Sequence, residues 1–290
     1  MKTQEIYVKT ILTRTNIPGM DYCINPYIGC SHACRYCYAT YMRKYSGHDE
    51  PWGSFLDVKA NAVELLKKAL RRDRRGQVIL SSVTDPYQEA EASYGLTRGC
   101  LELLSRSRLS VSVLTKSDLV IRDADIMERM ESVEVGLTIT TNSEIIKRVF
   151  EPHSPSIASR VRALRVLQRR AIPRFVFIGP ILPMDPVKLA ELIGPSTQRV
   201  LIDRMNYTWK VKETYREHRM QRYLDESYFA ETEARLLEAL RTHGVDATVV
   251  WAGAISGGPS SSDLACRHRT AHKNRHLKLQ VFRHHPYRPI

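Results

Sequence analysis

Short apolar runs alternate with amphipathic stretches along most of the chain. The runs Val78–Val83, Leu109–Thr115 and Val133–Ile139 are short and mostly apolar, which predicts buried strands. Between them, Thr97–Arg106 and Asp123–Met130 show the apolar spacing of helices. Strands and helices in alternation indicate βαβ units with a parallel sheet.

The same alternation extends toward both ends of the chain. The remaining expected strands are Asp21–Gly29, Arg174–Ile181, Val200–Asp203 and Ala247–Trp251, and the remaining expected helices are Val58–Arg72, Pro155–Arg170, Val187–Ile193 and Tyr215–His243. About six βα units in succession fit either an open sheet or a barrel. In both folds ligands bind at the carboxyl ends of the strands, so the polar residues there are the candidates for a site.

Three cysteines follow the first expected strand in the segment Cys30-Ser-His-Ala-Cys34-Arg-Tyr-Cys37. Thiolates bind soft metals and iron–sulfur clusters. Three of them hold three corners of a [4Fe–4S] cluster and leave one iron without a cysteine. A structural zinc ion, with His32 as its fourth ligand, is the alternative. The spacing favours the cluster over zinc.

The length of the chain and its apolar stretches limit the fold class and the cellular location that we expect. The 290 residues are enough for one α/β domain with a large core. No apolar stretch is long enough to span a bilayer, and the first residues lack the pattern of a secretory signal. We therefore expect a cytoplasmic protein without membrane contact. Cys23, Cys100 and Cys266 are expected to be ordinary thiols.

The formal net charge is +13, which suggests an anionic partner such as nucleic acid. However, seven of the 44 Lys and Arg residues, and none of the acidic residues, lie in 266–290. We expect residues 1–256 to form the folded domain, with a core at about 20–206 and a helical extension at about 207–256. The basic segment 257–290, which opens with the linker-like Gly257–Ser262, is expected to be a disordered tail or a non-native sequence. A nucleic-acid-binding arm is the alternative.

The cysteine motif and the sequence around it resemble those of a known family. The pattern C-x3-C-x-aromatic-C, with Tyr36 in the aromatic position, is similar to that of the radical S-adenosylmethionine (radical SAM) superfamily. Five further segments resemble its spore-photoproduct-lyase-like branch, often labelled "DNA repair photolyase": Asn25–Cys30, Cys37–Ala39, Ser81–Gln88, Leu114–Leu119 and Phe177–Pro183. The resemblance covers roughly Tyr7 to Asn206.

The resemblance implies a fold, two cofactors and a reaction. The fold is a partial (β/α)6 TIM-like barrel with a helical C-terminal extension. Cys30, Cys34 and Cys37 hold a [4Fe–4S] cluster, whose open iron binds S-adenosylmethionine (SAM). Reductive cleavage of SAM yields a 5′-deoxyadenosyl radical, which abstracts hydrogen from an unidentified substrate in a lyase or another radical reaction. The implied partners are a reductant such as a flavodoxin or ferredoxin, and a small-molecule or nucleic-acid substrate.

The resemblance also implies cofactor-binding residues at the ends of the strands. They are Tyr36, Ser82, Thr84, Asp85, Lys116, Ser117, Thr138, Thr140, Glu151, Arg160 and Gly179. Lys116 is expected to pair with the methionine carboxylate, and Thr138 and Thr140 to contact the ribose. Three plainer alternatives stay open: Lys116 as a solvated residue after its strand, Asp85 as a turn residue only, and Glu151 with Arg160 as an ordinary surface pair.

One departure from the branch bears on the substrate. Spore photoproduct lyases carry a hydrogen-donor cysteine at the end of the second strand, where this chain has Ser81-Ser82-Val83-Thr84-Asp85 without a thiol. This argues against thymine-dimer repair by that mechanism and favours a small-molecule or other non-DNA substrate. The alternatives are a nucleic-acid photolesion repair enzyme and a zinc-containing nucleic-acid-binding protein without catalysis.

Overall fold

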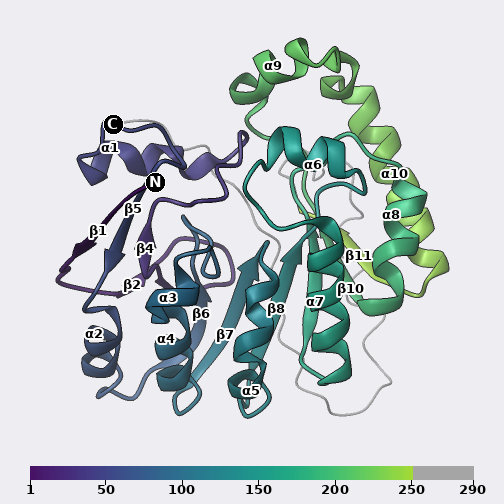
Figure 1. The fold of residues 1–290 in the computed structure, drawn as a ribbon. Coiled ribbons are helices and arrows are strands. Elements are labelled where there is room, and N and C mark those ends of the chain that lie inside the picture. Colours follow the sequence, from purple (N-terminus) through teal and green to yellow (C-terminus); the bar gives the residue numbers. More distant parts are fainter. Residues whose placement is uncertain (251–290) are drawn as a thin grey trace, which may run out of the picture.

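A computed structural model describes residues 1–250, and its centre is an eight-stranded sheet (Figure 1). The order of the strands across the sheet is β11-β10-β9-β8-β7-β6-β3-β2. Their bounds are β2 Leu12–Arg14, β3 Tyr22–Ile24, β6 Arg75–Leu80, β7 Arg108–Thr115, β8 Val133–Thr138, β9 Arg174–Ile178, β10 Arg199–Ile202 and β11 Asp246–Val249. From β3 to β11 neighbouring strands are parallel, and only the edge strand β2 runs antiparallel in this sheet.

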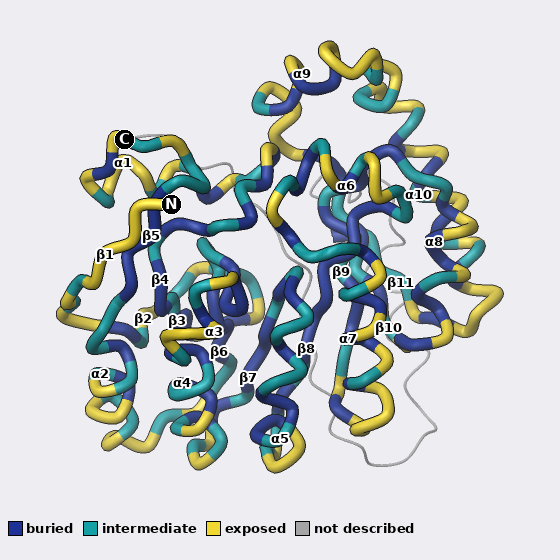
Figure 2. The backbone as a smooth tube through the Cα atoms, in the orientation of Figure 1, coloured by how far each residue is buried: buried dark blue, intermediate teal, exposed yellow. Residues whose placement is uncertain are grey.

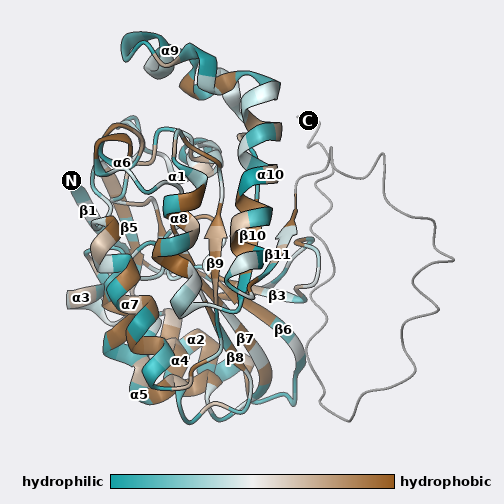
Figure 3. Cartoon of the chain, turned by 90° about the vertical axis from the view of Figure 1, so that its right-hand side faces the viewer, coloured by the Kyte–Doolittle hydropathy of each residue, from teal (hydrophilic) through white to brown (hydrophobic). Residues whose placement is uncertain are grey.

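Helices connect successive strands and cover one face of the sheet. They are α2 Ala62–Ala69, α4 Leu96–Leu104, α5 Ala124–Met127, α7 Ile157–Arg169 and α8 Pro186–Ile193. Figure 1 shows α2, α4, α5 and α7 side by side along this face, and Figure 3 shows the same layer from the side. The sheet does not close on itself within residues 1–250, because β2 and β11 both lie at its edges. The predicted α/β fold with an open, partial barrel is therefore confirmed.

The main core lies between the sheet and these helices. Tyr22 and Ile24 of β3 belong to it, and Figure 2 shows the central strands as a buried band. Cys23 points to the other face, where it forms a separate apolar cluster with Met20 and Ile79. This alternation follows from the two-residue period of a strand.

A second, smaller sheet differs from the sequence prediction. Its strands are β1 Lys2–Ile6, β5 Phe55–Lys59 and β4 Tyr27–Ile28, in the order β1-β5-β4. The expected strand Asp21–Gly29 is wrong as one element, because the chain leaves the large sheet after Ile24 and Pro26 has no N–H to donate to a ladder. The expected helix Val58–Arg72 was too long, since Val58 lies in β5.

The segment Tyr215–His243, expected to be mainly helical with room for a break, consists of separate helices, and the first of them begins before Tyr215. These are α9 Thr208–Glu217, the short 3-10 helix η4 Gln221–Leu224 and α10 Glu226–Thr242. Figure 1 shows α9 at the end of the barrel that carries the cysteine loop. There the Tyr215 ring packs on Phe150 with centroids 4.7 Å apart, and Arg35 Nη1 donates to Thr214 Oγ1 at 3.3 Å.

The remaining described elements are short. They are η1 Tyr38–Met42, α1 Arg43–Ser46, α3 Glu91–Tyr94, η2 Asp118–Asp123, α6 Glu144–Phe150 and η3 Gly194–Ser196. The predicted linker 257–262, the basic tail and Cys266 lie outside the described residues. None of the helices in residues 1–250 is long and apolar enough to cross a membrane.

Candidate active site

The three cysteines of the motif lie together in the loop between β4 and η1, at the carboxyl end of the barrel strands. Cys30 and Cys34 are buried and Cys37 is half-buried. Tight turns gather them: the Cys37 N–H donates to the Cys34 carbonyl at 3.1 Å, and Ala33 adopts φ 51°. The loop begins at Gly29 with φ +93°, where a side chain would overlap the carbonyl of Phe55.

The segment after β6 fixes the start of this loop. Thr84 Oγ1 donates to the Gly29 carbonyl at 2.5 Å, and Gln88 Nε2 donates to the same oxygen at 3.3 Å. The Gln88 side-chain oxygen accepts from the Ser31 N–H at 2.9 Å. Predicted site residue Thr84 therefore supports the cysteine loop through the backbone next to Cys30.

The donor set fits an iron–sulfur cluster better than a single ion. Burial raises the pKa of all three thiols, that of Cys34 to about 12, so the thiolates need a cationic group to stabilise them. In residues 1–250 no three His, Cys, Asp or Glu side chains converge on one metal ion. Zinc requires such convergence, whereas each thiolate of a cubane binds a different iron.

His32, the fourth ligand of the zinc alternative, lies beside Asp85 instead. Its Nε2 is 3.2 Å from Asp85 Oδ2, although the geometry is not that of a hydrogen bond. Both side chains are buried. The imidazole therefore faces a carboxylate, which gives no support to a role as a zinc ligand.

Glu151 and Arg160 form a buried ion pair behind the cysteine loop. Arg160 Nη2 lies 2.5 Å from Glu151 Oε2, and both side chains are 0–1% exposed, so the surface-pair alternative is wrong. Glu151 also accepts from Thr140 Oγ1 at 2.9 Å and from the Tyr36 hydroxyl. Burial alone would raise the pKa of Glu151, but Arg160 and Lys116 lower it to about 2. The carboxylate is thus charged and ties the loop residue Tyr36 to β8 and α7.

Lys116 follows β7 and points toward the same network. Its Nζ lies 5.6 Å from the centroid of the Tyr36 ring. Burial opposes its charge, but Cys34 and Glu151 outweigh burial and raise its pKa. Among residues 1–250, no ion pair or hydrogen bond engages this ammonium. A half-buried cation beside the thiol loop is therefore available to an anionic ligand.

Asp85 holds the end of β6 against the end of β7. Its Oδ1 accepts from the Tyr87 N–H at 2.9 Å and from Thr115 Oγ1 at 2.6 Å, and its Oδ2 accepts from the Lys116 N–H at 2.8 Å. The turn alternative is therefore part of its role, and the carboxylate also fixes the backbone of Lys116. Burial opposes the charge, but His32 and these donors hold the pKa of Asp85 well below its usual range.

The other predicted residues have distinct places. Ser117 caps η2 by accepting from the Leu119 N–H at 3.2 Å. Thr138 is buried and its carbonyl accepts from Arg160 Nη1 at 3.0 Å. Gly179 has no room for a side chain because of the Phe177 ring. Within the set, the structure brings together Tyr36, Lys116, Thr140, Glu151 and Arg160, and it places Ser82 apart, beside Asn25.

Sequence reasoning missed three contributors to this region. Asn25 Oδ1 accepts from the N–H groups of Ser82 and Val83, at 2.9 and 3.2 Å. Lys210 of α9 donates to the carbonyl of Cys37 at 3.0 Å, and Gln88 binds the loop as described above. Asn25 and Gln88 stand inside the quoted motifs, which was their only signal. Lys210 lies 173 positions from Cys37 and left no local signal.

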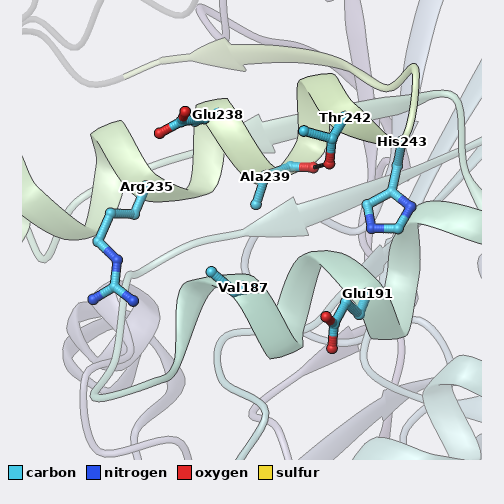
Figure 4. Close-up of a pocket in the computed structure, with 7 residues that line it drawn as sticks. All are labelled: Val187, Glu191, Arg235, Glu238, Ala239, Thr242 and His243. Carbon is cyan, nitrogen blue, oxygen red and sulfur yellow. Dashed lines mark hydrogen bonds between the residues drawn. The ribbon is translucent and has the colours of Figure 1, made fainter.

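Two surface hollows flank the fold. One, of about 300 Å³, lies between α8 and α10 and is lined by Val187, Glu191, Arg235, Glu238, Ala239, Thr242 and His243 (Figure 4). It contains none of the predicted site residues. The other, of about 320 Å³, borders the cysteine loop at Ser31 and His32 and also touches Ser117 and Ser154. The second hollow therefore adjoins the candidate site, and the first does not.

Comparisons with known proteins identify relatives of this chain. The chain is 41% identical over 190 residues to an uncharacterized protein of Methanocaldococcus jannaschii, covering 66% of this chain and 71% of that protein. It is 33% identical over 171 residues to an uncharacterized protein of Mycobacterium bovis, covering 56% of this chain and spanning half of that protein's length.

Solved structures share the fold at low identity. Spore photoproduct lyase complexed with dinucleoside spore photoproduct has a TM-score of 0.60 at 15% identity, covering 85% of this chain and 81% of that one. Streptococcus suis SuiB bound to precursor peptide SuiA has a TM-score of 0.54 at 10% identity, covering 78% of this chain and 48% of SuiB.

A family model identifies the class. The model of the radical SAM superfamily matches residues 24–193, which is more than half of the chain and includes the cysteine loop and the strands β6 to β9. This match disfavours the alternative of a non-catalytic zinc protein. The chain belongs to the radical SAM superfamily of enzymes.

Proposed function

We propose that Cys30, Cys34 and Cys37 hold a [4Fe–4S] cluster and that the residues behind the loop bind SAM at its open iron. Membership of the family implies both cofactors. When bound, they supply a 5′-deoxyadenosyl radical that takes hydrogen from a substrate. The protein's own contribution is to hold the thiols, to orient the ligand and to exclude water.

The observation that carries the proposal is the ammonium of Lys116. It is half-buried, no ion pair or hydrogen bond engages it among residues 1–250, and it lies beside the Tyr36 ring and close to Cys34. A buried cation without hydrogen-bond partners is costly unless a ligand supplies them. We assign the methionine carboxylate of SAM to this position.

The remaining predicted residues divide into two roles. Asp85 positions Lys116 by accepting its backbone N–H, and Thr84 positions the loop through Gly29. Glu151 and Arg160 hold Tyr36 under the loop and are therefore positioning residues. Ser82, Ser117, Thr138, Thr140 and Gly179 stay as predicted contacts to the nucleoside and the amino group.

Metal analysis and EPR of the anaerobic protein test this proposal. Reconstituted wild type should bind about four irons per chain, as a [4Fe–4S] cluster requires. SAM should change the EPR spectrum of the reduced cluster, because it binds directly to an iron. Cys34→Ala should lose most of the iron, while Cys100→Ala, a buried thiol in α4 far along the chain from the loop, should keep it. A wild-type spectrum that is insensitive to SAM would contradict the proposal.

The substrate and the electron donor are also proposals. A radical SAM enzyme needs a one-electron reductant, and we infer one of the flavodoxin or ferredoxin class. The absence of a thiol in Ser81–Asp85 supports a small-molecule or other non-DNA substrate. The likeness to spore photoproduct lyase, at 15% identity, is one of fold and carries no substrate with it.

A further inference from the structure

A short segment that follows the cysteine loop in the chain is fixed to the small sheet. It comprises residues 48–54 and connects α1 to β5. At its start His48 Nε2 lies 2.7 Å from Asp57 Oδ1, and at its end the Ser54 carbonyl accepts from the Lys2 N–H at 2.8 Å. Both ends of the 48–54 segment are therefore anchored to strands.

The same segment lies directly against the cysteine loop. Gly53 adopts φ +94°, and a Cβ on it would lie 2.4 Å from the Cβ of Ala33, which stands between Cys30 and Cys34. A side chain at this position would push the two segments apart, so only glycine permits the contact. The 48–54 segment is thus packed on the residues that carry the thiols.

Trp52, the residue before Gly53, has a buried N–H group without an acceptor. Its Nε1 is buried and makes no hydrogen bond to any of residues 1–250. The indole ring meets the Phe55 ring edge to face with centroids 5.9 Å apart, and Phe55 stacks on His48 with centroids 4.2 Å apart. An indole N–H can only donate, and a buried one usually has a partner. The fold therefore holds a donor in place without giving it an acceptor.

The side chain next to this donor is that of Cys37. Burial raises the pKa of the Cys37 thiol, and the Ala39 N–H, the ammonium groups of Lys116 and Lys210 and the indole of Trp52 oppose this rise. Groups that oppose it stabilise negative charge on the sulfur. The indole N–H of Trp52 is thus placed to donate to a sulfur that carries charge.

We propose that the indole N–H of Trp52 donates a hydrogen bond to the sulfur of Cys37 in the loaded enzyme and raises the reduction potential of the cluster. This inference rests on the proposed function. Reduction transfers one electron from the flavodoxin- or ferredoxin-class reductant to the cluster, and no bond breaks, because the proton stays on the indole. The added negative charge spreads over the sulfurs, so a donor to one of them stabilises the reduced cluster more than the oxidised one. Hydrogen bonds to the sulfurs are among the properties that set the potential of such clusters.

A redox titration of the reconstituted holoenzyme without SAM, followed by EPR, tests this role. Trp52→Phe keeps an aromatic ring against Phe55 and removes the N–H. At the wild-type midpoint potential, its ratio of reduced to oxidised cluster should be about three- to tenfold lower, which corresponds to about 30–60 mV for a one-electron couple. Trp209→Phe, whose side chain is 72% exposed, is the matched control and should keep the wild-type midpoint. A midpoint of Trp52→Phe equal to or above that of wild type would overturn the proposal.

A second measurement leaves Trp52 in place. The chain has three tryptophans, and Trp251 lies outside the described residues. The double variant Trp209→Phe, Trp251→Phe, produced with tryptophan that carries 15N in the indole ring, therefore has Trp52 as its single labelled side chain. Pulsed EPR of its reduced cluster should show a 15N coupling, because the hydrogen bond brings the indole nitrogen close to the unpaired spin. Absence of this coupling would contradict the proposal, even if Trp52→Phe assembled no cluster.

Failure of the proposed function would be a different result. The wild type would then hold no [4Fe–4S] cluster, or its reduced spectrum would not respond to SAM. If only the inference about Trp52 fails, the cluster and its response to SAM are intact, and neither the midpoint potential nor the 15N coupling depends on Trp52.

Discussion

Replacing Arg160 by Met is the sharpest test of the network behind the cysteine loop. Arg160 is fully buried, and its guanidinium lies 2.5 Å from the Glu151 carboxylate and donates to Ser154 Oγ at 2.6 Å. It also donates to two backbone carbonyls, that of Thr138 at 3.0 Å and that of Pro155 at 3.1 Å through Nε and 3.0 Å through Nη2. The variant leaves the Glu151 carboxylate buried without its main counter-charge. Removing one partner of a buried ion pair costs about 3–5 kcal/mol.

The neighbours of Glu151 place the expected cost in this range. Tyr36 and Thr140 still donate to the carboxylate, and Lys116 is close, so we expect the lower end, about 3 kcal/mol. In the double variant with Glu151→Gln the unpaired charge disappears. The loss of stability should then be smaller than the sum of the two single changes by about 1–3 kcal/mol.

Urea unfolding of the anaerobic protein, followed by circular dichroism, measures these free energies. The matched control is Arg162→Met on the same helix, whose side chain is 66% exposed and pairs with Asp118 at the surface. Exposed pairs contribute at most about 1 kcal/mol. If Arg160→Met cost no more than Arg162→Met, the buried pair would not support the loop and the reasoning would be refuted.

Three further predictions follow from other contacts. Lys116→Met should weaken SAM binding by about ten- to a hundredfold, which corresponds to the loss of a hydrogen bond to a charged group. Lys116→Arg keeps the charge and should weaken binding less in equilibrium titrations. Equal affinities of Lys116→Met and wild type for SAM would contradict the assigned role. His48 Nε2 lies 2.7 Å from Asp57 Oδ1, and hydrogen bonds to carboxylates outweigh burial and raise the pKa of His48. The free energy of unfolding in urea should therefore fall as the pH rises above about 6.5, and His48→Gln should flatten that dependence. An unchanged pH profile in the variant would count against this role. Gly29→Ala should lower the free energy of unfolding by about 1–3 kcal/mol, because φ is +93° and the new side chain meets the Phe55 carbonyl; an unchanged thermal midpoint would contradict this.

The parallel strands could be predicted because burial on both faces makes them apolar. Val78–Val83 and Leu109–Thr115 overlap β6 and β7 for this reason. By contrast, β1 reads KTQEI and is almost wholly exposed, so no hydrophobic pattern marks it. In β5 the buried Asp57 interrupts the apolar run, and its partners Gln4 and His48 lie 53 and 9 positions away in the sequence.

The residues of the candidate site were predictable only where they belong to a recognisable sequence motif. The cysteine loop and Lys116 stand in segments that resemble the family, whereas no motif surrounds Lys210. Its side chain reaches the carbonyl of Cys37 only because α9 folds back over the loop.

Formation of 5′-deoxyadenosine tests the central claim most directly. Reconstituted wild type with SAM and dithionite under strictly anaerobic conditions should release 5′-deoxyadenosine and methionine. Cys34→Ala should release none, and Cys100→Ala should match wild type. Absence of 5′-deoxyadenosine from a wild-type protein with its cluster intact would contradict the account.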